Sequence, residues 1–143
     1  MVRAFIVEDD ADFANSLVSA VSQLPEIEVT GVFPTAMSLV KAIPVDDSAA
    51  REWLPDFLFV DVYAFERLEN RRSGGAIDGV TLAAYLCQVR PDMRVLVISS
   101  INPSALLESF KEKGLSRWAY LLKSTSLSVM DIQRAVRELL DRP

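Results

Sequence analysis

Four carboxylates of this sequence stand directly after apolar runs. Glu8, Asp9 and Asp10 follow one run, and Asp61 ends another at residues 57–61. Adjacent carboxylates repel one another, so a site that gathers them usually holds a cation. The simpler alternative is that one or two of them cap the next helix, because acidic side chains favour a helix N-terminus. The first group of acids therefore indicates either a site for a hard metal ion or a helix start.

The chain contains no histidine. Ser-His and Cys-His nucleophile pairs, histidine-ligated zinc and a phosphohistidine carrier are therefore excluded. The single cysteine, Cys87, has apolar neighbours, which favours a core position over a reactive one. Polar chemistry is left to carboxylates, lysine, hydroxyl groups and a hard metal ion.

The apolar runs that precede these polar residues have the pattern of strands. Residues 3–7, 57–60 and 95–98 carry apolar residues in succession rather than in alternation, which is typical of strands covered on both faces. Residues 27–33 alternate and are rich in β-branched side chains, which indicates a strand at an edge of the sheet. Residues 118–122 form the last expected strand.

Segments with helical spacing of apolar residues alternate with these strands. Such alternation predicts a parallel sheet with right-handed crossovers. Residues 45–55 are ambiguous, since they could extend a helix or form a separate turn. Thr35 and Ser128 are expected caps, the latter with Asp131 at capping-box spacing. The expected helices cover residues 12–24, 35–43, 79–89, 103–113 and 128–140.

Polar side chains stand at the carboxyl end of four of the expected strands. Parallel strands bring these ends to one edge of the sheet, which is where open α/β folds bind ligands. Several polar groups at one edge indicate a binding site more specifically than any one of them alone. The residues concerned are Glu8, Asp9, Asp61, Ser99 and Lys123.

Length, charge and composition set further limits. The 143 residues fit one domain, and no apolar run approaches the roughly 20 residues of a membrane helix. The first residues do not have the pattern of a secretory signal, so the cytoplasm is the expected compartment. A net charge of −5 argues against direct binding of nucleic acid by this domain.

Five pieces of the sequence resemble the receiver domain of two-component response regulators. They are VEDD at 7–10, FLFVD at 57–61, DG at 78–79, VLVISS at 95–100 and YLLK at 120–123. The resemblance covers residues 1–143 as a single receiver domain and is greatest to receivers of the NarL/LuxR type. It implies an α/β, flavodoxin-like (βα)5 three-layer sandwich with strand order 2-1-3-4-5, an order given for this family in general.

The resemblance implies phosphorelay signal transduction. Asp61 would take a phosphoryl group from the phosphohistidine of a sensor histidine kinase or phosphotransfer protein, forming an aspartyl phosphate. Glu8 and Asp9, with Asp61 and the backbone carbonyl of Tyr63, would hold Mg²⁺. The protein would catalyse only its own phosphorylation and dephosphorylation, and is otherwise not an enzyme.

The resemblance also assigns three groups around the phosphoryl oxygens. Lys123 would contact one of them as a compact cation, and the Ser99 hydroxyl would bond another. Tyr120 would be the aromatic residue whose position changes together with Ser99. The implied output is a switched surface for a partner or for a homodimer, with neither nucleic acid nor membrane contacted directly.

The sequence departs from the family pattern around the expected site. Phe65 stands four residues after Asp61 where proline is usual, and Ser124 replaces the proline that often follows the lysine. The loop at about residues 63–77 is longer than usual by roughly ten residues. These departures leave every chemical group of the site in place.

Other function classes remain as alternatives. The main one is a degenerate receiver that acts as a phosphorylation-independent interaction module, although such modules usually lack one of the acids or the lysine. A haloacid-dehalogenase-type phosphatase would need a second acid where Tyr63 stands, and the glycines form no nucleotide-binding motif. The sequence does not indicate what the phosphorylation controls. An output domain beyond residue 143 and a stand-alone receiver both remain open.

Overall fold

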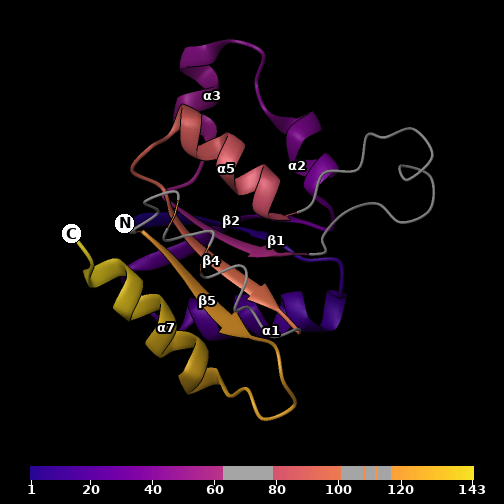
Figure 1. Ribbon diagram of the computed structural model, residues 1–143, viewed down its shortest axis with the longest axis vertical. Coiled ribbons are helices and arrows are strands. Elements are labelled where there is room, and N and C mark those ends of the chain that lie inside the picture. Colours follow the sequence, from indigo (N-terminus) through magenta and orange to yellow (C-terminus); the bar gives the residue numbers. More distant parts are fainter. Residues whose placement is uncertain (63–78, 101–107, 109–111, 113–116) are drawn as a thin grey trace.

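Five parallel strands form a single sheet in the order β2-β1-β3-β4-β5 (Figure 1). The computed structural model describes residues 1–62, 79–100, 108, 112 and 117–143. The predicted strands and their order are confirmed. The strands are β1 (Val2–Val7), β2 (Ile27–Phe33), β3 (Phe57–Asp61), β4 (Arg94–Ser99) and β5 (Trp118–Leu122).

Helices cover both faces of the sheet and make a three-layer sandwich (Figure 1). Residues 45–55, which were ambiguous in the sequence, contain a separate helix that is capped by Asp46. The helix expected at 103–113 and the loop expected at 63–77 lie outside the described residues, apart from Glu108 and Glu112. One face carries α1 (Ala11–Ser22) and α7 (Val129–Asp141), and the other carries α2 (Ala36–Ala42), α3 (Asp47–Trp53) and α5 (Gly79–Val89).

The central strand β3 is buried along its whole length, which explains its unbroken apolar run. Leu58 and Val60 belong to the core beneath α5, whereas Phe57 and Phe59 belong to the core beneath α1 and α7. Successive side chains of a strand point to opposite faces, so a strand between two helical layers needs apolar residues at every position. Asp61 is the first polar residue of this strand and lies at its carboxyl end.

Side-chain caps fix where the helices begin. The Asp10 carboxylate accepts hydrogen bonds from the backbone N–H groups of Asp12 and Phe13, at 3.0 and 3.3 Å, and so caps α1. The caps expected at Thr35 and Ser128 are confirmed, each as a capping box. The Asp10 cap turns the chain into α1 directly after Glu8 and Asp9, so α1 starts at the edge of the sheet where these acids lie.

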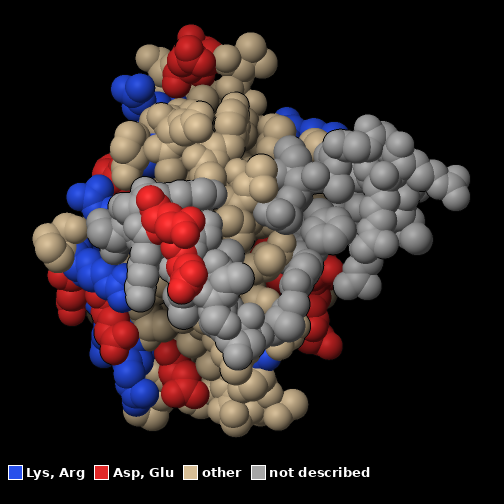
Figure 2. Space-filling view, in the orientation of Figure 1, with Lys and Arg blue, Asp and Glu red and all other residues tan. Residues whose placement is uncertain are grey.

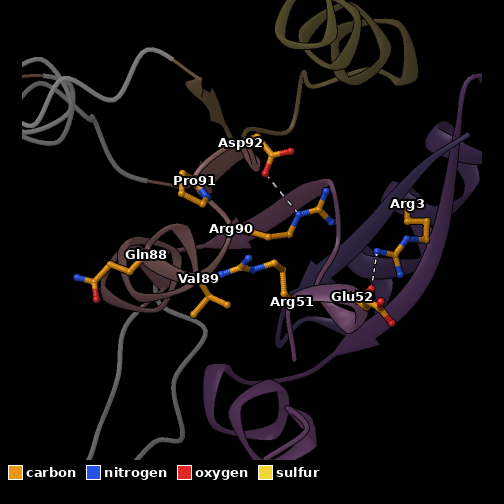
Figure 3. A pocket seen from close by; sticks show the side chains of 8 residues that line it. All are labelled: Arg3, Arg51, Glu52, Gln88, Val89, Arg90, Pro91 and Asp92. Carbon is orange, nitrogen blue, oxygen red and sulfur yellow. Dashed lines mark hydrogen bonds and ion pairs between the residues drawn. The ribbon is translucent and has the colours of Figure 1, made fainter. Parts of the chain in front are cut away.

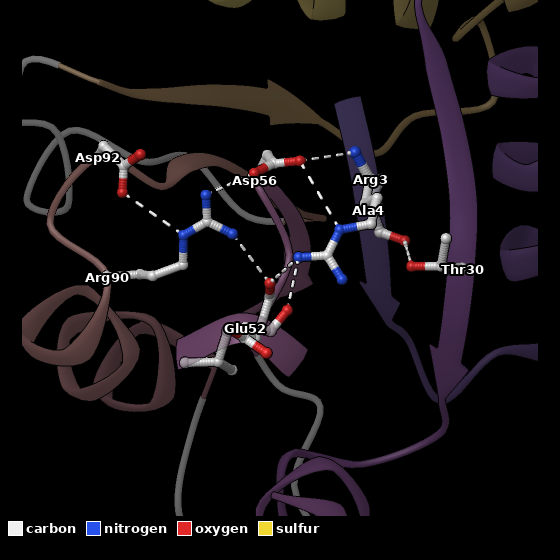
Figure 4. Close-up of polar contacts among 8 residues, drawn as sticks. Arg3, Ala4, Thr30, Glu52, Asp56, Arg90 and Asp92 are labelled. Atoms are coloured by element: carbon white, nitrogen blue, oxygen red, sulfur yellow. Dashed lines mark hydrogen bonds and ion pairs between the residues drawn. The ribbon is translucent and has the colours of Figure 1, made fainter. Parts of the chain in front are cut away.

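A network of ion pairs joins β1, β3 and α5 at the opposite, amino-terminal edge of the sheet (Figure 4). The Asp56 carboxylate accepts from the Arg3 backbone N–H at 2.9 Å and from the Arg90 guanidinium. Both guanidinium groups also donate to the carbonyl of Leu54, at 2.7 and 2.9 Å. Burial opposes ionisation of Asp56, but its hydrogen bonds to Arg3 and Arg90 hold the pKa of this carboxyl below its usual range.

An open hollow of about 700 Å³ lies beside this network, between the ends of α3 and α5 (Figure 3). Arg51 points across it toward the end of α5, while Arg90 is already committed to Asp56 and Asp92. The arginines Arg3 and Arg90 of this hollow therefore hold structural elements together.

Charged side chains of both signs lie side by side over α7 (Figure 2). Arg134 pairs with Asp131 at 3.8 Å, and Arg137 pairs with Glu26 at 3.5 Å. These arginines are thus accompanied by carboxylates.

No helix in the described part of the chain is both long and apolar enough to span a membrane.

Candidate functional site

Three carboxylates meet at the carboxyl edge of the sheet. Val7 of β1 pairs with Val60 of β3, so the residues that follow them emerge side by side. One oxygen from each of Glu8, Asp9 and Asp61 lies within 4.8 Å of the others. Glu8 and Asp61 are buried, at 3% and 7% exposed, whereas Asp9 is exposed. The cluster is therefore a largely buried pair of acids with a third acid at its opening.

The ammonium group of Lys123 lies against the buried acids. Its Nζ atom is 2.7 Å from Glu8 Oε1 and 3.5 Å from Asp61 Oδ2. The backbone N–H of Lys123 donates to the carbonyl of Ser99 at 2.7 Å, which attaches the end of β5 to the end of β4. Burial disfavours the ammonium ion, but the Glu8 carboxylate and then Asp61 raise the pKa of Lys123. The site therefore contains a fixed cation.

Lys123 alone does not offset the burial of Glu8 beside Asp61. Burial and the neighbouring Asp61 raise the pKa of Glu8 to about 8, against the opposing bonds from Lys123 and the Asp10 backbone N–H. A second positive charge would favour ionisation of Glu8. Three carboxylate oxygens, one of them open to solvent, are the donor type that Mg²⁺ prefers. These residues therefore fit a hard divalent ion.

Ser99 ends β4 at the same edge, and the side chain of Tyr120 contacts it. Asp61 pairs with Ile98 of β4, so Ser99 stands one residue beyond the partner of Asp61 and is 3% exposed. The Tyr120 hydroxyl donates to the backbone carbonyl of Ser99 at 3.3 Å. Ser99 therefore ends β4 at this edge, whereas Tyr120 lies in the middle of β5 beside Val97 and reaches the edge through its hydroxyl. Tyr63 lies outside the described residues, so the role of its carbonyl stays a prediction.

Phe13 is a member of the site that sequence reasoning placed only in the core. Its ring packs partly against the core beneath α1, and its centroid is also 4.5 Å from the Nζ atom of Lys123. Nothing in the local sequence links the two residues, because the contact depends on how the sheet brings the end of β5 near the start of α1. The only hint is that the first turn of α1 follows directly after the acids.

Gly79 packs closely against the backbone of Asp61. A Cβ atom at this position would lie 2.1 Å from the backbone oxygen of Asp61 and 2.6 Å from a methyl group of Val60. The Gly79 backbone N–H donates to the carbonyl of Val62 at 3.0 Å. The first residue of α5 therefore packs directly on the carboxyl end of β3, and only glycine leaves room for this approach.

Solved structures match the chain, whereas sequence comparisons do not. No family model matches the sequence, and no curated protein matches it. The receiver domain of RcsB from Salmonella enterica serovar Typhimurium, solved with phosphomimetic BeF₃⁻, matches with a TM-score of 0.71 and 17% identity, over 97% of this chain and 88% of that chain. The receiver domain of a putative response regulator NarL from Mycobacterium tuberculosis matches with a TM-score of 0.69 and 23% identity, over 99% and 98%.

A further match is a LuxR-family DNA-binding response regulator from Staphylococcus aureus, with a TM-score of 0.70 and 12% identity, over 97% of this chain and 98% of that chain. Structural matches at such low sequence identity establish the fold alone. The roles of individual residues rest on the geometry described above. The strand order and the helical layers agree with that result. The chain therefore has the fold of response-regulator receiver domains, as the resemblance in its sequence predicts.

Proposed function

We propose that the chain is a phosphoacceptor domain of a phosphorelay, with Asp61 as the residue that carries the phosphoryl group. The observation that supports this most is the meeting of Glu8, Asp9, Asp61 and Lys123 at one edge of the sheet. A carboxylate that is buried beside a cation, and that belongs to an acidic cluster with the donors for a metal ion, is suited to nucleophilic attack on phosphorus.

The residues of this site have separable tasks. An oxygen of Asp61 attacks the phosphorus of a phosphohistidine on a kinase or phosphotransfer partner, and the P–N bond breaks as the new P–O bond forms. Glu8, Asp9 and Asp61 would hold Mg²⁺, and the Tyr63 carbonyl is expected to join them. A bound Mg²⁺ supplies positive charge that offsets the repulsion between the attacking carboxylate and the phosphoryl oxygens.

Lys123 and Ser99 act on the transferred group. The ammonium lies 3.5 Å from Asp61 in the resting site, within reach of an oxygen bound there. The Ser99 hydroxyl would bond a second oxygen, and Tyr120 would respond through the Ser99 carbonyl that its hydroxyl already contacts. The domain is thereby a signalling switch whose only catalysis is on itself, and the cytoplasm remains its expected compartment.

Phosphorylation by a small donor tests the proposal. We expect acetyl phosphate and Mg²⁺ to add one phosphoryl group, which intact-mass measurement detects, and we expect Asp61→Asn to remove this labelling. Asp56→Asn is the matched control, because Asp56 flanks the same strand at its other end and lies away from the cluster. Equal labelling of wild type and Asp61→Asn, or labelling that survives a chelator, would contradict the assignment.

A receiver that acts only as an interaction module is the second candidate. It predicts that the protein binds its partner equally well as wild type and as Asp61→Asn, with or without the phosphoryl donor. Oxygens of Glu8, Asp9 and Asp61 lie within 4.8 Å of one another and Lys123 pairs with Glu8, which favours the phosphoacceptor.

A further inference from the structure

The ammonium group of Lys123 contacts two carboxylates and one aromatic ring. Its Nζ atom lies 2.7 Å from Glu8, 3.5 Å from Asp61 and 4.5 Å from the centroid of the Phe13 ring, over which it lies. The Lys123 side chain is 21% exposed, so water reaches only part of it. Phe13 is in turn placed by the start of α1, where the Asp10 carboxylate accepts its backbone N–H at 3.3 Å.

An aromatic face and a carboxylate hold an ammonium in different ways. The face attracts the cation through its quadrupole, but it offers no oxygen to a metal ion and takes no proton. A carboxylate that turns toward a metal ion, by contrast, weakens its bond to the ammonium. Glu8 belongs to the cluster that fits a divalent ion and is also the nearest partner of Lys123. The carboxylate nearest to Lys123 is therefore also one that would bind the metal ion.

We propose that Phe13 is a positioning residue for Lys123. Its ring keeps the ammonium beside Asp61 while Glu8 is engaged elsewhere, so that Lys123 stays directed at the oxygen of Asp61. The effect of this contact on phosphoryl transfer rests on the function proposed above. The contact itself does not, because it belongs to the resting site.

The competing explanation is that Phe13 only fills the core. Its ring does pack against the core that α1 shares with α7. Two substitutions separate the explanations. Phe13→Leu keeps an apolar side chain in that core but removes the aromatic face, whereas Phe13→Tyr keeps the face and its position.

A ring-current measurement tests the contact without metal or donor. In wild type we expect the ε-methylene protons of Lys123 to resonate upfield of those of Lys41, because the Nζ atom bonded to this methylene lies over the Phe13 ring. Phe13→Leu should return them to the ordinary position, and Phe13→Tyr should retain the upfield shift. An unchanged Lys123 resonance in Phe13→Leu would overturn the inference, whatever the phosphorylation experiments show.

A double-mutant cycle tests the consequence. With acetyl phosphate and Mg²⁺, we expect Phe13→Leu to slow phosphorylation about three- to fivefold, in keeping with the strength of a partly exposed cation–π contact, and Phe13→Tyr to stay within about twofold. In a Lys123→Gln background, Phe13→Leu should slow the reaction no further.

The outcomes distinguish this inference from the proposed function. Equal slowing by Phe13→Leu in the presence and absence of Lys123 would show that the ring acts through the fold alone, and so would overturn the inference. Thermal unfolding of each variant identifies any general loss of structure. A wild type that accepts no phosphoryl group would overturn the proposed function, while the ring-current measurement would still decide whether Phe13 holds Lys123.

Discussion

Replacing Gly79 with alanine should displace the end of β3 and with it Asp61. The added Cβ would lie 2.1 Å from the backbone oxygen of Asp61, which is 1.3 Å short of the 3.4 Å at which ordinary contact begins. The obstacle is backbone on both sides, since Gly79 begins α5 and Asp61 ends β3. Neither element can rotate a side chain out of the way, so one of them must move.

The cost follows from this geometry. Overpacking a well-packed interior costs about 1–3 kcal/mol, and a backbone clash belongs at the upper end of that range. Movement of α5 would also weaken the bond from the Gly79 N–H to Val62, which adds about 1 kcal/mol. We therefore expect Gly79→Ala to lower the free energy of unfolding by about 3–4 kcal/mol and the melting temperature by roughly 10 °C. Phosphorylation of the protein that remains folded should also slow.

Gly31→Ala is the matched control. A Cβ atom there would lie 2.9 Å from the Phe33 ring and 3.0 Å from the Phe5 ring, which are side-chain rather than backbone atoms and are 0.8–0.9 Å farther away than the obstacle at Gly79. It sits on the edge strand β2, so we expect a loss within about 1 kcal/mol. Urea unfolding of both variants, followed by circular dichroism, measures the difference. If Gly79→Ala is as stable as Gly31→Ala, the close packing of α5 on β3 is not a constraint and the reasoning fails.

Three other predictions concern both edges of the sheet. Asp56→Asn should cost about 1 kcal/mol at neutral pH, discounted for partial exposure. The folded-state pKa of Asp56 lies below the ordinary 3.8, so the extra stability of wild type is present above pH 3.8 and is lost as the pH falls through the folded-state pKa. Acid unfolding of wild type and Asp56→Asn checks this. Lys123→Ala should slow phosphorylation at least about tenfold yet strengthen Mg²⁺ binding, because the competing cation beside Glu8 is gone; weaker Mg²⁺ binding by calorimetry would contradict this. Beryllofluoride should shift the amide resonances of Tyr120 and of the β5–α7 surface, and shifts confined to α2 and β2 would refute a switch there.

The sheet could be predicted from the sequence because its signals are local. Residues 57–60 are apolar at every position, and a strand with helices on both faces requires this pattern. The polar residue that ends such a run must emerge at an edge, and parallel pairing brings these residues together. Asp61, Glu8 and Ser99 were therefore found without knowledge of any contact.

The contacts between distant residues could not be predicted in this way. Phe13 and Lys123 meet because the side chain of Lys123 extends from the end of β5 to the acids that precede α1, a relation set by the whole sheet. Spacing along α1 assigns Phe13 to the core stripe, which is only part of its role. Asp56 directly precedes β3 in the sequence, but its partners Arg3 and Arg90 are distant along the chain, so the sequence does not indicate these contacts. The Asp-Gly pair at 78–79 was recognised as a family motif, while the need for glycine comes from the close approach to Asp61.

One aspartate precedes the strand β3 and another ends it, and we expect selection for folding and selection for signalling to act on them differently. Asp56 precedes the strand among arginines that satisfy it, and Asp61 ends the strand beside a second buried acid. In a library of single substitutions sorted only for folded protein, Asp56 should be depleted, whereas neutral replacements of Asp61 should survive or be enriched because they relieve charge repulsion. Sorting the same library for signalling should reverse the preference at Asp61 and leave that at Asp56 unchanged. Five residues apart, one aspartate would report on folding and the other on phosphoryl transfer.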